Sequence, residues 1–263
     1  MAHFSLLDHR YLIKVLIYRD IQAKYKGSFL GVLWSLLIPF VLLLVYTFVF
    51  SVIFQARWGT SGGNRVEFAL ILFAGLIVFN FFSECVNRAP AIILSNVNYV
   101  KKVVFPIEVL GVVAVGSALF NFFVSFFVWL IAYFILIGVP NLSIFLAPLY
   151  MVPLVLFVLG CVWLISAVGV YLRDVGQFVG IITTILMFMS PIFYPIEALP
   201  SRFQGFLYLN PLAFYIESFR DVVYWGRLPD IGLSLLALFL SIIFLLVSFG
   251  VFKKLKRGFA DVL

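Results

Sequence analysis

Residues 109–172 read VLGVVAVGSALFNFFVSFFVWLIAYFILIGVPNLSIFLAPLYMVPLVLFVLGCVWLISAVGVYL, a run of 64 residues without a charged side chain. About 20 apolar residues cross the hydrocarbon core of a bilayer, so the run is too long for one helix. The segment GVPN at 138–141 interrupts it, and glycine and proline are strong signals for a turn. This stretch therefore predicts two membrane-spanning helices joined by a tight turn.

The whole chain has the composition of a polytopic membrane protein. Of its 263 residues, 65% are apolar, 19% aromatic and 11% charged, whereas soluble domains average about 45–50% apolar and about 25% charged. A soluble domain of this size has too little interior for so much apolar surface, and disordered chains are polar. The two cysteines, Cys85 and Cys161, fit neither a disulfide framework nor a zinc site.

Charge-free runs predict an all-α fold with six spans. We expect the spans at about 31–54, 66–84, 109–137, 144–172, 175–196 and 231–252. Residues 1–30 then form a cytoplasmic or interfacial segment, 31–253 the transmembrane domain and 254–263 a cytoplasmic tail. With both termini inside, 13 basic residues lie in cytoplasmic segments and five outside, as the positive-inside rule requires. The net charge of +7 therefore reflects topology and not a nucleic-acid partner.

The segment before the first span has an amphipathic pattern. Leu12, Val15 and Leu16 fall at helical spacing among basic side chains. A helix of this kind lies in the membrane interface with its cations at the headgroups. The alternative is a plain charged flank that only sets the topology.

The longest inside loop, 84–108, contains a second amphipathic pattern. Pro90 and Pro106 bracket residues 91–105, where we expect one short helix. Its apolar face consists of Ile93, Val97, Val100 and Val104. Such a helix rests on the membrane or docks on a cytoplasmic partner, and the pattern alone favours neither. The charged pair at 173–174 marks a second, very tight inside turn.

The largest outside segment, 197–230, contains an apolar stretch too short to cross. Residues 203–216 number only 14, and Asn210-Pro211 interrupts them. We expect two half-depth helices that enter from the outer side; the alternative is a loop packed on the outer surface. Glu217 and Arg220 stand three residues apart, so they can pair on one helix face.

The sequence lacks the P-loop and the zinc-protease motif. It contains no G-x-x-x-x-G-K-[ST], so we expect no ATP site of the P-loop type, and it contains no H-E-x-x-H. The acidic residues fall at predicted span ends or in loops, whereas gradient-driven transporters carry ionisable groups at mid-membrane depth. We therefore expect no enzyme activity and no cofactor bound by this chain, with energy supplied by another chain.

Several motifs resemble those of type-two ABC exporter permeases, in order along nearly the whole chain. They are Arg19-Asp20, Tyr25, Ser28-Phe29-Leu30-Gly31-Val32-Leu33-Trp34 and Pro39; Lys101-Lys102-Val103-Val104-Phe105-Pro106; Arg173-Asp174 followed by Ser190-Pro191-Ile192-Phe193-Tyr194-Pro195; Asn210-Pro211-Leu212 with Arg220; and Phe259-Ala260-Asp261. The pattern is most similar to the membrane subunits of lipopolysaccharide O-antigen exporters, and capsule and teichoic-acid permeases are near relatives.

This resemblance implies a homodimeric channel in the bacterial inner membrane. Two copies of a separate cytoplasmic ATPase, which bind ATP and Mg, would dock below it. The implied substrate is a polysaccharide on an undecaprenyl diphosphate lipid, moved from the cytoplasmic to the outer leaflet. The loop after the second span would carry a coupling helix, and residues 197–230 would form outer gate helices.

The resemblance also assigns roles to residues. The ATPase-coupling residues are expected to be Val97, Val100, Lys101, Lys102, Arg173 and Asp174. The lipid-entry residues on the N-terminal helix are expected to be Arg10, Lys14, Arg19, Lys24 and Lys26. The outer-gate residues are expected to be Phe206, Tyr208, Asn210, Phe214, Tyr215, Glu217 and Arg220.

Two other functions remain as alternatives. A membrane-embedded acyltransferase or lipid-linked sugar transferase would need a cluster of catalytic His, Asp or Glu near a membrane face, and the sequence has none. Type-two permeases for drugs or ions often carry a large extracellular domain or different loop motifs. Co-purification of an ATPase would separate the permeases from the enzyme.

Overall fold

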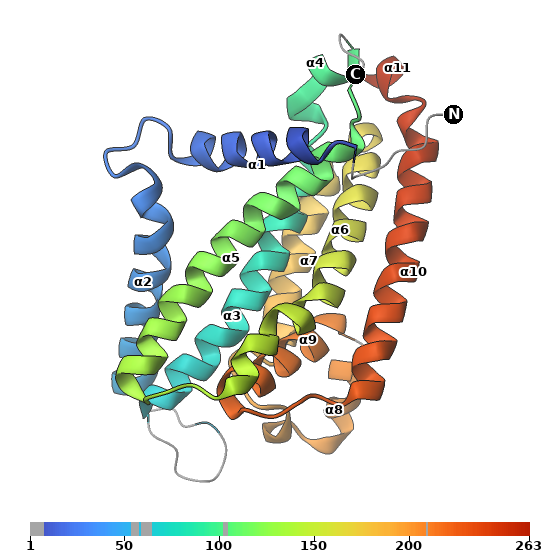
Figure 1. The fold of residues 1–263 in the computed structure, drawn as a ribbon. Helices are drawn as coiled ribbons and strands as arrows, with labels where there is room; N and C mark the ends of the chain where they lie inside the picture. The colour runs from blue at the N-terminus through green and yellow to red at the C-terminus, as the bar shows by residue number, and fades with distance from the viewer. Residues whose placement is uncertain (1–7, 54–57, 59–64, 102–104, 209) are drawn as a thin grey trace.

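The computed structural model describes residues 8–53, 58, 65–101, 105–208 and 210–263 as a helical bundle (Figure 1). Every regular element in these ranges is a helix, which confirms the predicted all-α class. Five apolar segments are long enough to cross a membrane: Gly31–Phe50, Val66–Ala91, Glu108–Leu136, Leu142–Tyr171 and Ile231–Lys256. Their α-helical parts are α2 (Trp34–Thr47), α3 (Arg65–Arg88), α5 (Glu108–Leu136), α6 (Ala147–Tyr171) and α10 (Ile231–Lys256). The predicted turn at 138–141 is present, and Gly138 adopts a φ of +122° there.

The fifth predicted span is shorter in the structure than in the sequence analysis. Instead of a continuous segment over 175–196, helix α7 covers Val175–Met189, which is 15 residues. At 1.5 Å per residue it is about 22 Å long, less than the roughly 30 Å of a hydrocarbon core. Pro191 is the cause, because proline disfavours helical backbone at the preceding residue, and Ser190 is extended with φ −96° and ψ 149°.

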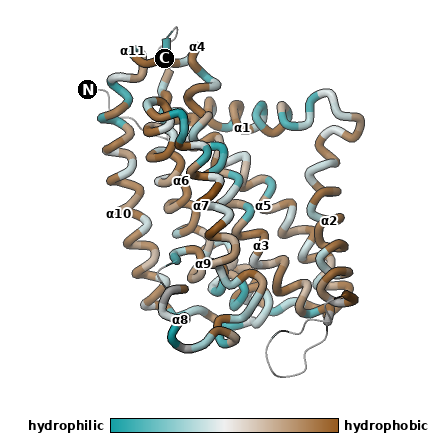
Figure 2. The backbone as a smooth tube through the Cα atoms, turned by 180° about the vertical axis from the view of Figure 1, so that it is seen from behind, coloured by the Kyte–Doolittle hydropathy of each residue, from teal (hydrophilic) through white to brown (hydrophobic). Residues whose placement is uncertain are grey.

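Two groups of short elements mark opposite ends of the bundle. Helix α1 (Arg10–Tyr25) lies across one end, near α4 (Val97–Lys101) and α11 (Phe259–Val262), and we name this the α1 end (Figure 1). The opposite end holds α8 (Ser201–Tyr208) and α9 (Pro211–Arg220), and we name it the α8 end. Hydrophobic residues follow the long helices, whereas hydrophilic residues gather in α1 and around α8 (Figure 2).

Helix α3 is the centre of the bundle. In its most apolar window 78% of the residues are buried, against 17% for the outer helices α2 and α10. The indole of Trp129 on α5 donates a hydrogen bond to the carbonyl of Leu70 on α3, with 2.8 Å between nitrogen and oxygen. The exposed apolar faces of α2 and α10 are available to lipid or to another chain.

Helix α1 is attached to α5 by an apolar contact. Leu16 is buried against Val109 and Val113, with Leu12 and Ile17 packed beside them. Gly116 has no side chain, which leaves room for the side chain of Ile17 on the α5 surface. The expected helix before the first span therefore exists, and it docks on the bundle through its apolar face.

Candidate functional site

The segment that follows α3 differs from the single helix expected over 91–105. It consists of 3₁₀ turns at Ala89–Ala91 and Leu94–Asn96, followed by α4, a helix of only five residues. Side chains compete with the helical backbone here, since the Ser95 hydroxyl and the Asn96 amide both donate to the carbonyl of Ile92. The expectation of one continuous helix was therefore wrong for the described part of this segment.

The expected coupling residues lie at the α1 end. Val97 and Val100 of α4 are half-buried and Lys101 is exposed, while Lys102 and Val104 lie outside the described residues. Arg173 and Asp174 are exposed in the short connection between α6 and α7, so the predicted tight turn is present. Within the described ranges their side chains make no hydrogen bond or ion pair.

The turn at 172–174 is packed close to the segment after α3. The backbone of Pro90 lies so near Gly169 of α6 that a Cβ on residue 169 would come within 2.9 Å of the Pro90 carbonyl oxygen. The Pro90 ring also approaches Gly176 at the start of α7. The structure thus brings the two expected coupling segments to the same end of the bundle (Figure 1).

The five basic residues expected at a lipid entry fall into two groups. Arg10, Lys14 and Lys26 are exposed and are available to headgroups. Arg19 instead donates a hydrogen bond of 3.0 Å to the hydroxyl of Tyr99 on α4. Lys24 forms an ion pair with Glu84 of α3.

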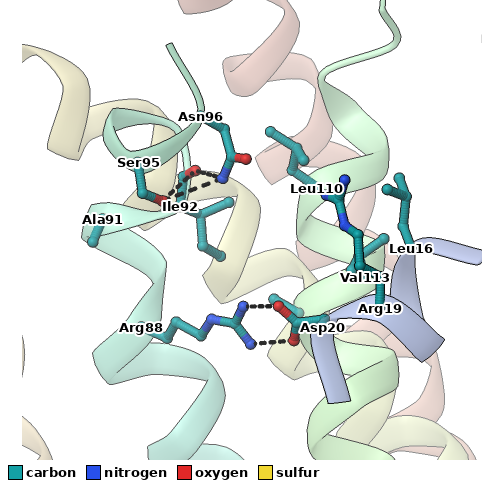
Figure 3. A pocket seen from close by; sticks show the side chains of 11 residues that line it. Leu16, Arg19, Asp20, Arg88, Ala91, Ile92, Ser95, Asn96, Leu110 and Val113 are labelled. Carbon is teal, nitrogen blue, oxygen red and sulfur yellow. Dashed lines mark hydrogen bonds and ion pairs between the residues drawn. The ribbon is translucent and has the colours of Figure 1, made fainter. Parts of the chain in front are cut away.

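An ion pair that the sequence analysis missed joins α1 to α3. Both terminal nitrogens of Arg88 donate to the two carboxylate oxygens of Asp20, one of them at 2.7 Å (Figure 3). Arg88 also donates to the hydroxyl of Ser117 on α5 at 3.2 Å. Burial alone raises the pKa of Asp20, but the hydrogen bonds from Arg88 and Ser117 and the charge of Arg88 together lower this pKa below its usual value.

The pair borders a cavity of about 190 Å³ between α1, the end of α3 and α5. Arg19, Asp20 and Arg88 line it together with Ser95 and Asn96 (Figure 3). The adjacent charges Arg19 and Asp20 are the one sequence signal for this contact. Asp20 and Arg88, however, are 68 positions apart in the chain. No local pattern identifies such a partner.

At the α8 end, the expected break at Asn210-Pro211 separates two short helices. The Asn210 side chain caps α9 by accepting from the backbone N–H of Leu212 at 3.0 Å. Its amide nitrogen donates to the hydroxyl of Ser190 at 2.9 Å. Asn210 therefore fastens the start of α9 to the residue that ends α7.

The aromatic residues expected in this region have different surroundings. Tyr215 is buried, and its hydroxyl lies 2.8 Å from the hydroxyl of Ser241 on α10. Phe214 is half-buried with its ring 5.6 Å from that of Tyr215. The side chains of Phe206 and Tyr208 lie outside the described part of the chain.

Arg220 is the most enclosed charge in the described chain, with a side chain that is 0% exposed. Its Nε donates to the carbonyl of Ile71 on α3 at 2.9 Å, and Nη2 donates to Ile192 at 2.9 Å. Nη1 donates to Pro191 and, at 2.9 Å, to Glu217. The expected pairing of Glu217 with Arg220 is present, but Arg220 also joins three separate segments.

The expectation of charges at span ends and in loops concerned the acidic residues, whereas the basic Arg220 lies within the bundle. Ile71 and Gly75, which flank the guanidinium of Arg220, lie roughly 9 and 15 Å along α3 from Arg65. Glu84 also lies within the apolar segment Val66–Ala91. Both the buried Arg220 and the half-buried Glu84 have protein partners.

Comparison with known proteins assigns the family. The ABC-2 type transporter family matches residues 11–224. The chain is 28% identical over 259 residues to the O-antigen export system permease protein RfbA of Myxococcus xanthus, covering 98% of this chain and 97% of the relative. It is 28% identical over 253 residues to RfbA of Klebsiella pneumoniae, covering 96% and 95%. It is 25% identical over 264 residues to the polysialic acid transport protein KpsM of Escherichia coli, covering 98% of each.

The family match covers most of the chain, and the relatives align over nearly its full length. The apolar helical bundle with short helices at both ends has the character of a transporter membrane subunit. The chain belongs to the ABC-2 type transporter family.

Proposed function

We propose that this chain is the membrane permease of an ATP-driven exporter that moves a lipid-linked surface polysaccharide of the O-antigen type across the bacterial inner membrane. The observation that carries the proposal is its similarity, over nearly the whole chain, to relatives named O-antigen export permeases. The polymer would travel on undecaprenyl diphosphate. Export of a capsule is the second candidate, supported by the similarity to KpsM.

The α1 end faces the cytoplasm in this proposal. Exposed basic residues gather there, on α1 and at the end of α10, where Lys253 and Lys254 lie in the last turn. Cytoplasmic flanks of membrane helices are rich in Lys and Arg. The described chain begins and ends at this end of the bundle (Figure 1), which fits both termini being inside.

A separate ATPase would supply the energy, because this sequence has no P-loop. Two permease chains and two ATPase chains would form the transporter. The ATPase would contact α4 and the turn at 172–174, which lie together at the α1 end. Val97 and Val100 would receive its movement, and Lys101 and Lys102 would provide positive charge at the contact.

Motion of α4 has a direct route into the bundle. Tyr99 stacks on Phe105 with 4.5 Å between ring centroids, and Phe105 packs against the apolar contact between α1 and α5. Arg19 bonds the hydroxyl of the same tyrosine. A displacement of α4 would therefore act on α1 and on the start of α5.

At the opposite end, α8 and α9 would close the pathway between substrates. They are too short to span the bilayer, and Asn210 and Arg220 hold α9 to α7 and α3. Aromatic side chains such as Phe214 would pack at rest and stack on sugar rings during passage.

The test is export in a strain whose own permease gene has been deleted. The wild-type chain, expressed with its ATPase, should restore polymer at the cell surface, while Val97→Asp with Val100→Asp should insert normally and fail to export. Asn98→Asp serves as the matched control, since Asn98 is exposed on α4. Export that persists at the normal level in the double variant would refute the coupling role. Failure of the wild-type chain to co-purify with any ATPase would refute the permease assignment.

A further inference from the structure

A cleft of about 360 Å³ lies between α2, α3, α5 and the end of α1. Its wall includes polar side chains from all four helices, among them Lys24, Asn80, Glu84, Asn121 and Ser125. Polar residues inside membrane-spanning segments are costly, and where they occur they mark functional sites. The cleft is separate from α4, from the turn at 172–174 and from the α8 end.

Part of this polar wall is already satisfied within the protein. The Asn121 amide donates to both oxygens of Glu84 at 2.9 Å, and Lys24 forms the ion pair with the same carboxylate. The three side chains form a fixed group whose charges cancel. Lys24 has three N–H donors, so two of them remain for another partner.

The other polar groups of the wall lack protein partners. Within the described ranges, the side chains of Asn80 and Ser125 make no hydrogen bond, and neither does the hydroxyl of Tyr25. Asn80 is exposed, although it lies on the largely buried helix α3. An unsatisfied polar group in hydrocarbon costs several kcal/mol, so these groups require a ligand or water.

The backbone of α2 lacks one helical hydrogen bond beside the cleft. Pro39 lies inside α2 and is buried. Proline has no N–H, so the carbonyl of Ser35, four residues earlier, does not receive the hydrogen bond that residue 39 would otherwise donate. Ser35 and Pro39 both line the cleft.

Polarity in the cleft changes along the bundle axis. Lys24, Tyr25 and Glu84 lie toward the α1 end, while Ile38, Leu42, Phe73 and Ile77 line the part that lies farther from that end. A lipid of the leaflet at the α1 end has the same order, with its head at the surface and its tail toward the membrane centre. Donors that remain at the polar end are the two N–H groups of Lys24 not used by Glu84, the amide nitrogen of Asn80 and the hydroxyl of Tyr25. Phosphate oxygens are acceptors that suit such donors.

We propose that this cleft binds one lipid with a phosphate-bearing head, drawn from the leaflet at the α1 end. Lys24, Asn80 and Tyr25 would bond the phosphate, and the apolar part beyond Ile38 would hold the first segment of the tail. This inference rests on the proposed function in two respects. The proposed function makes the leaflet at the α1 end the cytoplasmic one, and it makes an isoprenoid diphosphate one source of the bound lipid. A glycerophospholipid of the same leaflet is the other source.

The test measures lipid binding to the purified chain in detergent by native mass spectrometry, without ATPase or transport. The probes are farnesyl diphosphate, dioleoylphosphatidylglycerol and, as a head without phosphate, dioleoylglycerol. We expect one phosphate lipid per chain and at least tenfold weaker binding of dioleoylglycerol, because one or two charge-assisted hydrogen bonds are lost. Binding of both phosphate probes supports recognition of the phosphate head, and a preference for farnesyl diphosphate adds recognition of the tail.

Asn80→Leu should weaken phosphate-lipid binding by about tenfold. Its control is Asn98→Leu on α4, which should bind as the wild type does. Ser125→Ala is a second variant in the cleft. It changes the side-chain volume only slightly, so the fold should stay intact. Equal binding of dioleoylglycerol, or undiminished binding by Asn80→Leu, would overturn the proposal. Because ATP hydrolysis and export are not measured, failure of the permease assignment would leave this result intact.

Discussion

The guanidinium of Arg220 rests on Gly75 of α3, so closely that a Cβ on residue 75 would lie 2.5 Å from Nη2. Glycine at this position lets a charged side chain pass between helices and reach the carbonyls of Pro191 and Ile192. Those carbonyls lie just after α7 ends. Arg220 therefore satisfies backbone groups that a continuous span would have bonded internally.

Gly75→Ala should destabilise the protein, because the methyl group displaces a guanidinium that several acceptors hold in place. Overpacking of this kind costs about 1–3 kcal/mol. Thermal unfolding in detergent measures the effect. Gly250→Ala on α10 is the control, since nothing lies within 4 Å of a Cβ there, and it should be neutral or slightly stabilising. Equal melting temperatures for the two variants would contradict a tight contact between Gly75 and the guanidinium of Arg220.

Loss of the contact between Arg19 and Tyr99 should lower the amount of polymer exported per ATP hydrolysed. We expect Arg19→Gln and Tyr99→Phe each to reduce this ratio about two- to tenfold, the effect of one hydrogen bond. The double variant should be no worse than either single variant. Tyr18→Phe is the control, because the Tyr18 hydroxyl bonds Gln22 within α1. Additive losses would show that the two residues act independently.

The pair between Asp20 and Arg88 should stabilise the protein at neutral pH and lose its effect in acid. The pKa of Asp20 is lowered in the folded state, so its contribution is complete above the unfolded-state value of about 3.9 and falls as the pH drops through the folded value. Asp20→Asn should cost about 1–3 kcal/mol at pH 7. Melting temperatures from pH 3 to pH 8 should show the wild type and the variant converging at the acidic end. A constant difference would assign the loss to some other cause.

Single cysteines in α8 and α9 should react with a membrane-impermeant reagent in a pattern set by burial. In a background without Cys85 and Cys161, residues 205 and 211 are exposed and should label, whereas Leu212 and Ile216 are buried and should not. If α8 and α9 form a gate, trapping the ATPase with bound nucleotide should change this pattern. Uniform labelling that ignores the ATPase would indicate a static surface loop.

The sequence predicts the membrane-spanning architecture well, because the signals are local. Charge-free runs and the turn at 138–141 locate the long helices to within a few residues. The early end of α7 also has a local cause, the proline in Ser190-Pro191. The apolar run over 175–196 nevertheless suggests a full span. The segment 91–105 misleads because its apolar period fits a helix, while the short-range bonds from Ser95 and Asn96 favour 3₁₀ turns.

The candidate sites are less predictable because their contacts are not local. The pair of Glu217 with Arg220 follows from helix spacing, and the structure has it. The contact of Arg220 with Ile71 spans 149 residues, and that of Arg19 with Tyr99 spans 80. A basic residue in the sequence reveals its charge, but only the packing decides whether it is exposed, as Lys14 is, or paired with a carboxylate, as Lys24 is.

The separation of 68 positions along the chain between Asp20 and Arg88 imposes an order on biosynthesis. Asp20 leaves the ribosome first, and its partner follows only after α2 and nearly all of α3 have been made. Until then the carboxylate of Asp20 on α1 lacks its partner, and the apolar face of α1 has no α5 to cover it. Docking of α1 is thus a late event of assembly, so a nascent chain that stalls before α5 should present α1 to proteases that the finished protein resists.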